Sequence, residues 1–197
     1  MFHVAEKWYL CKLVSESKIM GFFVSERMTS APERFSTPLQ EKVYAMLSRL
    51  GIGFERVDTD PGITMEDCQN INSGLGGRIV KTLFLCNRQQ TIFYLYVTRD
   101  NKPFVTKDFG AALGIPRVSF ASAELLQEKV GTEHGASTIL SACLDSARYV
   151  NFVIDREVLE SEDFCCSDGT VGCFMKIKTS DLLNVYLPAC GHKPIII

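Results

Sequence analysis

Lys81 is the residue whose type and position most clearly indicate chemistry in this chain. It lies at the head of the apolar run Val80–Cys86, which has the composition of a buried strand. An ammonium group in such a place must either reach out to water or hold an anionic group. A lysine at the end of a strand is commonly a solvated edge charge, so a functional interpretation depends on what the rest of the chain supplies.

The run that contains Lys81 is predicted to pair with the run that follows it. Four polar residues, 87–90, separate it from the β-branched and aromatic stretch 91–97. Two such runs joined by a short polar turn favour a β-hairpin. Lys81 is therefore expected on a rigid sheet.

Helices and further strands are expected around this hairpin. Thr37, Pro38 and Gln40 combine an N-cap, a first-turn proline and a capping-box side chain, so a helix should begin there. Further helices are predicted after Thr64, Thr106, Ser122 and Thr179, and further strands at 54–57, 118–120, 149–154 and 174–177. Interleaved helices and strands with a hairpin predict a mixed α/β fold, in which a mixed, largely antiparallel sheet or a partly closed barrel is flanked by helices.

Composition limits the partners that this chain can have. Its 197 residues are 46% hydrophobic, which is enough for the core of one domain. With 21 Lys+Arg against 23 Asp+Glu, it lacks the positive charge of a protein that grips long stretches of nucleic acid, so any such contact should be local. Charged residues interrupt the apolar part of the first 34 residues, which excludes a signal core or a membrane span there, and we expect no membrane partner.

The cysteines predict neither disulfides nor a metal site. The chain has eight, and no two have the C-x-x-C spacing of a zinc or redox site. Reduced thiols of a cytoplasmic protein are the simplest interpretation. The cluster Cys165, Cys166 and Cys173 is the one group that could hold a metal, and we interpret it instead as part of a turn; we predict no metal and no cofactor.

A catalytic triad is not indicated. The three histidines, His3, His134 and His192, have no recognisable nucleophile motif beside them. Any hydrolysis would then proceed without an obvious covalent nucleophile.

Six segments of the chain occur in an order that resembles a known family. They are LGIGFERVD (50–58), MEDC (65–68), VKTLFLCNR (80–88), KPFVTKD (102–108), LGIPRVSFASAE (113–124) and GHKP (191–194). Together they resemble the YbaK/ProX family of aminoacyl-tRNA deacylases, whose ProX branch is similar to the editing domain of bacterial prolyl-tRNA synthetases. The resemblance covers about three quarters of the chain.

The resemblance implies a site and a mechanism. Members of the family hold the 3′-terminal aminoacyl-adenosine and let a bound water attack the ester, so positioning and oxyanion stabilisation would supply the catalysis. On this interpretation Lys81 matches the essential lysine that anchors the substrate. The implied catalytic residues are Lys81, Gly135 and His192, and the implied substrate contacts are Thr82, Ala136, Ser137 and Gly191.

Two positions depart from the family pattern. Thr82 stands where many ProX members have asparagine, which leaves the preferred amino acid open. Ile139 stands where a proline is expected four residues after Gly135, so the loop lacks a fixed φ and is expected to be less preorganised.

Pocket energetics indicate why such an enzyme would be needed. A synthetase pocket shaped for proline cannot strongly reject alanine, because a missing methylene or two changes the binding free energy by only about 1–3 kcal/mol. We therefore expect deacylation of mischarged Ala-tRNA(Pro) in trans by a cytoplasmic monomer that recognises the acceptor end of tRNA(Pro) and could work beside prolyl-tRNA synthetase. Two alternatives stay open: a Cys-tRNA(Pro) deacylase of YbaK type, and a non-catalytic module that binds tRNA or a synthetase.

The resemblance also predicts a domain boundary. Residues 36–197 would form the editing domain, and residues 1–35 would be an N-terminal extension that could be poorly ordered. Nothing in residues 1–34 resembles the family, and 1–27 could be an extension or an artefact of the assigned start site.

Overall fold

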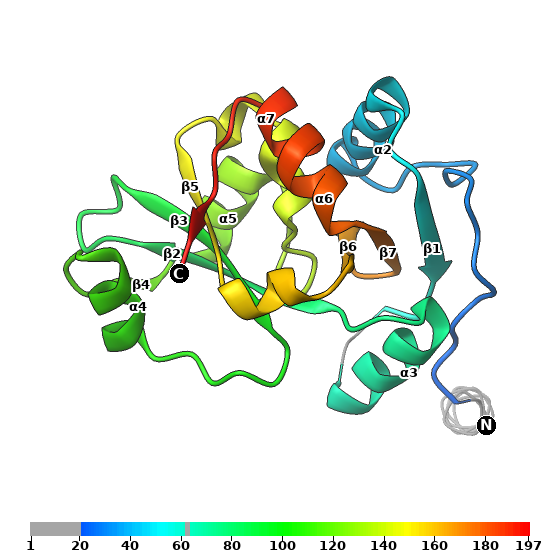
Figure 1. The fold of residues 1–197 in the computed structure, drawn as a ribbon, viewed down its shortest axis with the longest axis horizontal. Coiled ribbons are helices and arrows are strands. Elements are labelled where there is room, and N and C mark those ends of the chain that lie inside the picture. Colours follow the sequence, from blue (N-terminus) through cyan, green and yellow to red (C-terminus); the bar gives the residue numbers. More distant parts are fainter. Residues whose placement is uncertain (1–20, 62–63) are drawn as a thin grey trace, which may run out of the picture.

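The computed structural model describes residues 21–61 and 64–197, and it has a mixed α/β fold built on two sheets (Figure 1). The five-stranded sheet has the strand order β4-β2-β3-β5-β8, and the three-stranded sheet has the order β1-β7-β6. The strands of the first are β4 (Ser119–Phe120), β2 (Val80–Cys86), β3 (Phe93–Arg99), β5 (Val150–Ile154) and β8 (Ile195–Ile196). Those of the second are β1 (Phe54–Asp58), β7 (Cys173–Lys178) and β6 (Asp163–Thr170). The predicted mixed, largely antiparallel arrangement is confirmed, and the described strands form two sheets, not a closed barrel.

The predicted hairpin is confirmed as β2 and β3. The two strands pair antiparallel from Val80 opposite Arg99 to Cys86 opposite Phe93. β3 begins two residues later than predicted because Asn87 Oδ1 accepts from Thr91 N (2.8 Å) and Ile92 N (3.1 Å), which keeps both in the turn. β3 then pairs parallel with β5, so it lies inside the sheet and is buried along almost its whole length.

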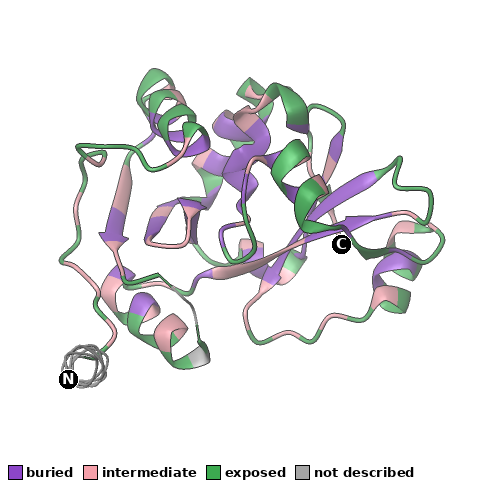
Figure 2. Ribbon diagram, turned by 180° about the vertical axis from the view of Figure 1, so that it is seen from behind, coloured by how far each residue is buried: buried purple, intermediate pink, exposed green. Residues whose placement is uncertain are grey.

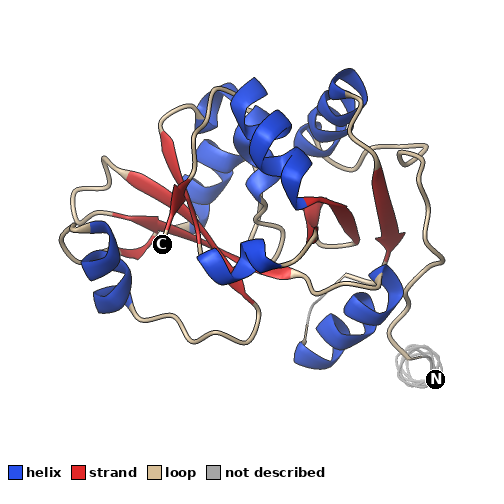
Figure 3. Cartoon of the chain, viewed as in Figure 1, coloured by secondary structure: helices blue, strands red, loops and turns tan. Residues whose placement is uncertain are grey.

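Local capping signals start α2 (Pro38–Leu50) and α3 (Met65–Leu75) where the sequence predicts a helix. Thr37 Oγ1 accepts from Gln40 N (3.0 Å) at the start of α2, and Thr64 and Asp67 form a complete capping box at the start of α3. The α-helices are α2 (Pro38–Leu50), α3 (Met65–Leu75), α4 (Thr106–Leu113), α5 (Ala123–Val130), α6 (Thr179–Asp181) and α7 (Leu187–Ala189). Three 3₁₀ segments, η1 (Ile139–Cys143), η2 (Asp145–Ala147) and η3 (Arg156–Glu160), join them, and a π-helical turn, η4 (Leu182–Tyr186), links α6 to α7. Figure 3 shows these helices around the strands of both sheets.

The main core lies between the sheets and the helices that cover them. It includes Val43 and Leu47 of α2, Leu95 of β3 and Phe152 of β5, all with at most 2% of their surface exposed. Figure 2 shows the buried residues on the strands and on the inward faces of the helices, with exposed residues outside. Within the described residues, no helix is both long and apolar enough to cross a membrane.

The interpretation of the cysteine cluster as part of a turn is wrong. Cys165 and Cys166 lie in β6, and Cys173 begins β7, so a short turn separates two paired strands that carry them. All three thiols are buried, each with at most 3% exposed. The seven cysteines that the structure describes are free thiols.

The described part of the predicted N-terminal extension lies beside β1. Val24 forms a bridge with Thr59, and Met28 forms one with Arg56. Residues 1–20, on which the rest of that prediction falls, lie outside the described residues.

Candidate active site at the junction of the two sheets

The two sheets meet beside Lys81 and leave a cavity there. Ile79, just before β2, forms a parallel bridge with Cys165 of β6. The adjoining cavity has a volume of about 290 Å³. Its lining comes from both sheets, from α3 and from the loop after α5: Cys68, Ile79, Val80, Lys81, Thr82, Asp100, Gly135, Ser137, Ser167 and Phe174. Four of the predicted site residues, Lys81, Thr82, Gly135 and Ser137, are thus brought together.

Lys81 is half-buried and its ammonium group is held by backbone carbonyls. It lies opposite Thr98 in the β2–β3 pair. Its Nζ donates to Lys102 O and makes a longer contact of 3.5 Å with Asp100 O. An ammonium group has three N–H donors, so at least one stays available to a ligand in the cavity.

The Gly135 loop lines the same cavity as Lys81. Gly135 has φ +89°, a conformation that favours glycine. Ala136 N donates to Glu133 O (3.1 Å), and Ala136 is fully buried and does not line the cavity. Within the described chain, the N–H groups of Gly135 and Ser137 meet no acceptor, so these amides can serve a developing oxyanion.

The loop is anchored without the proline of the family pattern. Ile139 is fully buried and begins η1. Thr138 caps this segment, its Oγ1 accepting from Leu140 N (3.3 Å), and Ser141 Oγ donates to Thr138 O (2.8 Å). A buried side chain and a capping hydroxyl therefore provide restraint that a proline would otherwise give.

Six lining residues were not predicted as site residues: Cys68, Ile79, Val80, Asp100, Ser167 and Phe174. Ser167 Oγ donates to Thr170 O (2.7 Å), lies 3.4 Å from Ala136 O and accepts from Gly169 N (3.0 Å), so it joins the loop to the β6–β7 hairpin. Cys68 ends the MEDC segment (65–68) of the family resemblance, whereas Ser167 lies in β6, which was not predicted.

Of the seven cysteines that the structure describes, Cys68 alone lines the cavity. Burial raises its pKa above the ordinary value, and the carboxylates of Asp100 and Asp67 add to this effect. A raised pKa keeps the sulfur protonated near neutral pH, which makes it a poor nucleophile.

Gly191 and His192 do not line this cavity. The His192 ring packs edge-on against Phe152, with 4.5 Å between ring centroids, and its backbone N donates to Leu187 O (2.9 Å). Burial lowers the pKa of His192, although a hydrogen bond with the Ala142 backbone acts in the opposite direction. The catalytic role implied for His192 stays a prediction.

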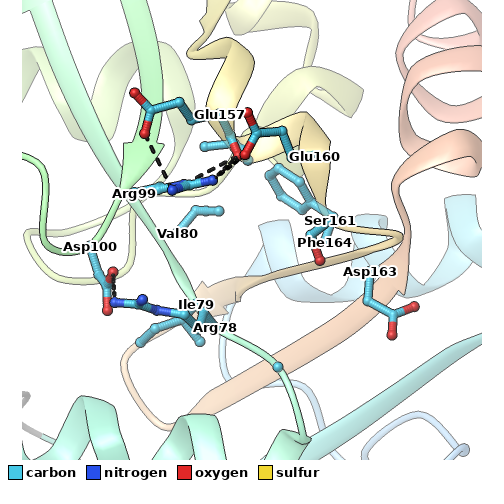
Figure 4. A pocket seen from close by; sticks show the side chains of 12 residues that line it. Arg78, Ile79, Val80, Arg99, Asp100, Glu157, Glu160, Ser161, Asp163 and Phe164 are labelled. Carbon is cyan, nitrogen blue, oxygen red and sulfur yellow. Dashed lines mark hydrogen bonds and ion pairs between the residues drawn. The ribbon is translucent and has the colours of Figure 1, made fainter.

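A larger cavity of about 540 Å³ adjoins the site on the side of Val80 and Asp100. Its arginines are already paired: Arg78 lies 2.8 Å from Asp100, and Arg99 lies 2.6 Å from Glu160 and 3.4 Å from Glu157 (Figure 4). Lys81 does not line it. Ion pairs therefore occupy its cations, and the chemistry is better placed in the smaller cavity.

The described residues contain no group of three or more His, Cys, Asp and Glu side chains placed to hold a metal ion. The donors at the site are an ammonium group, backbone amides and hydroxyls. These groups bind anions and polarised carbonyls.

The fold and this site define an aminoacyl-tRNA editing domain. Residues 59–185 match the family of that description, the aminoacyl-tRNA editing domain, and the chain belongs to this family.

Individual relatives agree with this assignment. The chain is 30% identical over 161 residues to the prolyl-tRNA synthetase associated domain-containing protein 1 of Danio rerio, covering 81% of this chain and 86% of that one. It is 28% identical over 120 residues to the prolyl-tRNA editing protein ProX of Acetoanaerobium sticklandii, covering 61% and 73%. A crystal structure of a candidate trans-editing enzyme for prolyl-tRNA synthetase shares the fold, with a TM-score of 0.62, 16% identity, and coverage of 83% and 97%.

Proposed function

We propose that this protein is a trans-acting deacylase that hydrolyses mischarged Ala-tRNA(Pro) to alanine and free tRNA. The observation that carries the proposal is that one cavity is lined by the half-buried Lys81 and by Gly135 and Ser137, whose N–H groups meet no acceptor among the described residues. Donors fixed in advance around one point are what an ester-hydrolysing site needs to stabilise a tetrahedral oxyanion.

Water is the nucleophile in this proposal. Among the described residues no histidine lines the cavity, and the Cys68 thiol is kept protonated, so none of them there is set up for covalent attack. The water oxygen forms a bond to the ester carbonyl carbon, the bond from that carbon to the ribose oxygen breaks, and the water proton ends on that oxygen. Lys81 and the loop amides would lower the barrier by stabilising the charge that develops on the carbonyl oxygen.

Selection of alanine would rest on the size of the cavity. The apolar part of the cavity lining comes from Ile79, Val80 and Phe174. Phe174 is only 3% exposed, so the rest of its side chain packs against the protein and cannot easily move aside. A rigid apolar wall excludes a larger side chain because overpacking costs about 1–3 kcal/mol. Proline, which is larger than alanine, would be rejected on these grounds.

The test is incubation of purified protein with labelled Ala-, Cys- and Pro-tRNA(Pro). Release of alanine, with little release of proline, is the expected result. Preferential release of cysteine would replace alanine by cysteine as the substrate, and binding of all three without release would show a non-catalytic module. Adding prolyl-tRNA synthetase to the same reactions tests whether the synthetase is a partner.

A further inference from the structure

The ammonium group of Lys81 is held by one short turn, residues 99–102, which follows β3. Lys102 O accepts from Lys81 Nζ, and Asp100 O lies 3.5 Å from it. A backbone carbonyl can orient an ammonium group only if its own turn is fixed in place. The contacts that fix this turn therefore bear on the geometry of the active site.

The side chain of Lys102 fastens the turn to a buried carboxylate. Lys102 Nζ lies 2.6 Å from Asp155 Oδ2 and 2.9 Å from Glu157 Oε1. Asp155 is 2% exposed and also accepts from Tyr96 OH (3.1 Å) and Thr98 Oγ1 (3.0 Å). A buried carboxylate is costly without a cation, so the pair resists separation. Burial acts to raise the pKa of Asp155, but Lys102 and the other hydrogen bonds outweigh it and hold that pKa below its usual value.

The other residues of the turn are tied more weakly. Arg99 donates to Glu157 O (3.0 Å) and pairs with Glu160, and Asp100 pairs with Arg78, as Figure 4 shows. The arginine side chains of these pairs are 41% and 64% exposed, so water and salt screen them. The buried carboxylate of Asp155 is therefore the stronger anchor.

A second connection joins the anchor to the same lysine. Thr98, which donates to Asp155, is the residue opposite Lys81 in the β2–β3 pair. Asp155 is thus linked to Lys81 in two ways. It pairs with Lys102, whose carbonyl accepts from the Lys81 ammonium group, and it accepts from Thr98, which lies opposite Lys81 in the sheet.

We propose that Asp155 and Lys102 are positioning residues, which hold the 99–102 turn so that its carbonyls aim the Lys81 ammonium group into the cavity. Neither lines the cavity, and both act through Lys81. This inference rests on the proposed function for its consequence in catalysis, but the restraint on Lys81 can be measured without any substrate.

The first experiment measures deacylation of Ala-tRNA(Pro) by Asp155→Asn and Lys102→Met. A displaced ammonium group should lower kcat about 10- to 100-fold and leave KM nearly unchanged. Lys102→Arg, which can still pair with both carboxylates, should restore most of the activity. When Lys81 is already replaced by methionine, neither substitution should lower the deacylation rate further, because both act through Lys81. A substitution that disturbed the structure in general would lower the rate of the double variant below that of Lys81→Met alone.

The second experiment needs no activity. Limited acetylation followed by mass spectrometry reports how accessible the Lys81 amine is, and both variants should raise its labelling rate several-fold over the wild-type protein. Lys178→Met removes a lysine that is paired with Glu162 and Asp163 away from the cavity, and it should leave Lys81 labelling unchanged. Lys102→Met leaves the Asp155 carboxylate with the hydroxyls of Tyr96 and Thr98 as donors, and Lys102→Arg keeps a cation there, so these two variants keep the inference testable if Asp155→Asn does not fold.

Unchanged Lys81 labelling in both variants would overturn the inference. If the wild-type protein released no amino acid but labelling rose as expected, the proposed function would fail and the positioning inference would stand.

Discussion

Replacement of Lys81 by methionine is the most direct perturbation of the proposed site. Methionine keeps the length and apolar stem of the side chain and removes only the cation. The structure shows one ammonium donor used by Lys102 O, a weaker contact to Asp100 O, and at least one donor left for the cavity. Loss of one donor to a developing oxyanion costs about 2.7–4 kcal/mol, so kcat should fall at least about 100-fold.

The effect on folding should be small by comparison. The carbonyls that lose their partner lie near the surface, where water can replace it, so the loss in unfolding free energy should be about 1 kcal/mol. For a chain of this size that is a fall of about 2–4 °C in Tm. Single-turnover deacylation of Ala-tRNA(Pro) and a thermal melt measure the two effects, with Lys178→Met as the matched control. Activity within about threefold of wild type would refute the role given to Lys81, and so would a loss of activity that follows the unfolded fraction.

Further predictions concern the loop, its support and the C-terminal histidine. Gly135→Ala should lower the free energy of unfolding by about 1–2 kcal/mol, because Gly135 has a φ of +89°, and it should abolish most of the deacylation activity. Gly51→Ala is the control, because Gly51 has a φ of +64° and lies outside the cavity. It should lower the free energy of unfolding by the same amount in urea and leave the activity intact. Ser167→Ala should lower the free energy of unfolding by about 1–3 kcal/mol and lower kcat by roughly an order of magnitude, because it removes the hydroxyl that bonds Ala136 O and Thr170 O. An unchanged kcat would contradict this prediction. Burial lowers the pKa of His192, so the unfolded chain binds a proton first as pH falls below about 6.5. The stability that the neutral His192 contributes is therefore complete above that pH and is lost as the pH falls toward the pKa of the folded protein. His192→Gln should make the free energy of unfolding in urea depend less on pH in this range. An unchanged pH dependence would contradict this prediction.

Local signals predicted the elements that local interactions stabilise. The caps at Thr37, Thr64 and Ser122 each accept from the amide three positions later in the chain, so four residues of sequence contain the whole signal. The β2–β3 hairpin is similar, because its turn and both strands are adjacent in the chain.

β6 could not be predicted because distant partners stabilise it. Its polar residues look like a turn, but Asp168 is fully buried and accepts from Gln40 Nε2 (2.7 Å) and Tyr44 OH (3.1 Å) of α2, more than 120 residues earlier. Burial raises the pKa of Asp168, and these donors act against that rise. The same omission hid Ser167 from the predicted site, whereas Phe174 lies in β7, whose strand was predicted at 174–177 without a role in the site.

The placement of the site at the seam between two sheets explains why its composition could be predicted only in part. Lys81 belongs to the five-stranded sheet, Ser167 and Phe174 belong to the three-stranded sheet, and the Gly135 loop bonds to Ser167 and lines the same cavity as Lys81. The seam is close-packed at Gly77, where a Cβ would lie 2.6 Å from Cys165 Sγ, so a side chain there would push the sheets apart. The geometry of the proposed site therefore depends on how the two sheets pack, which is a tertiary property that no single motif of the chain encodes.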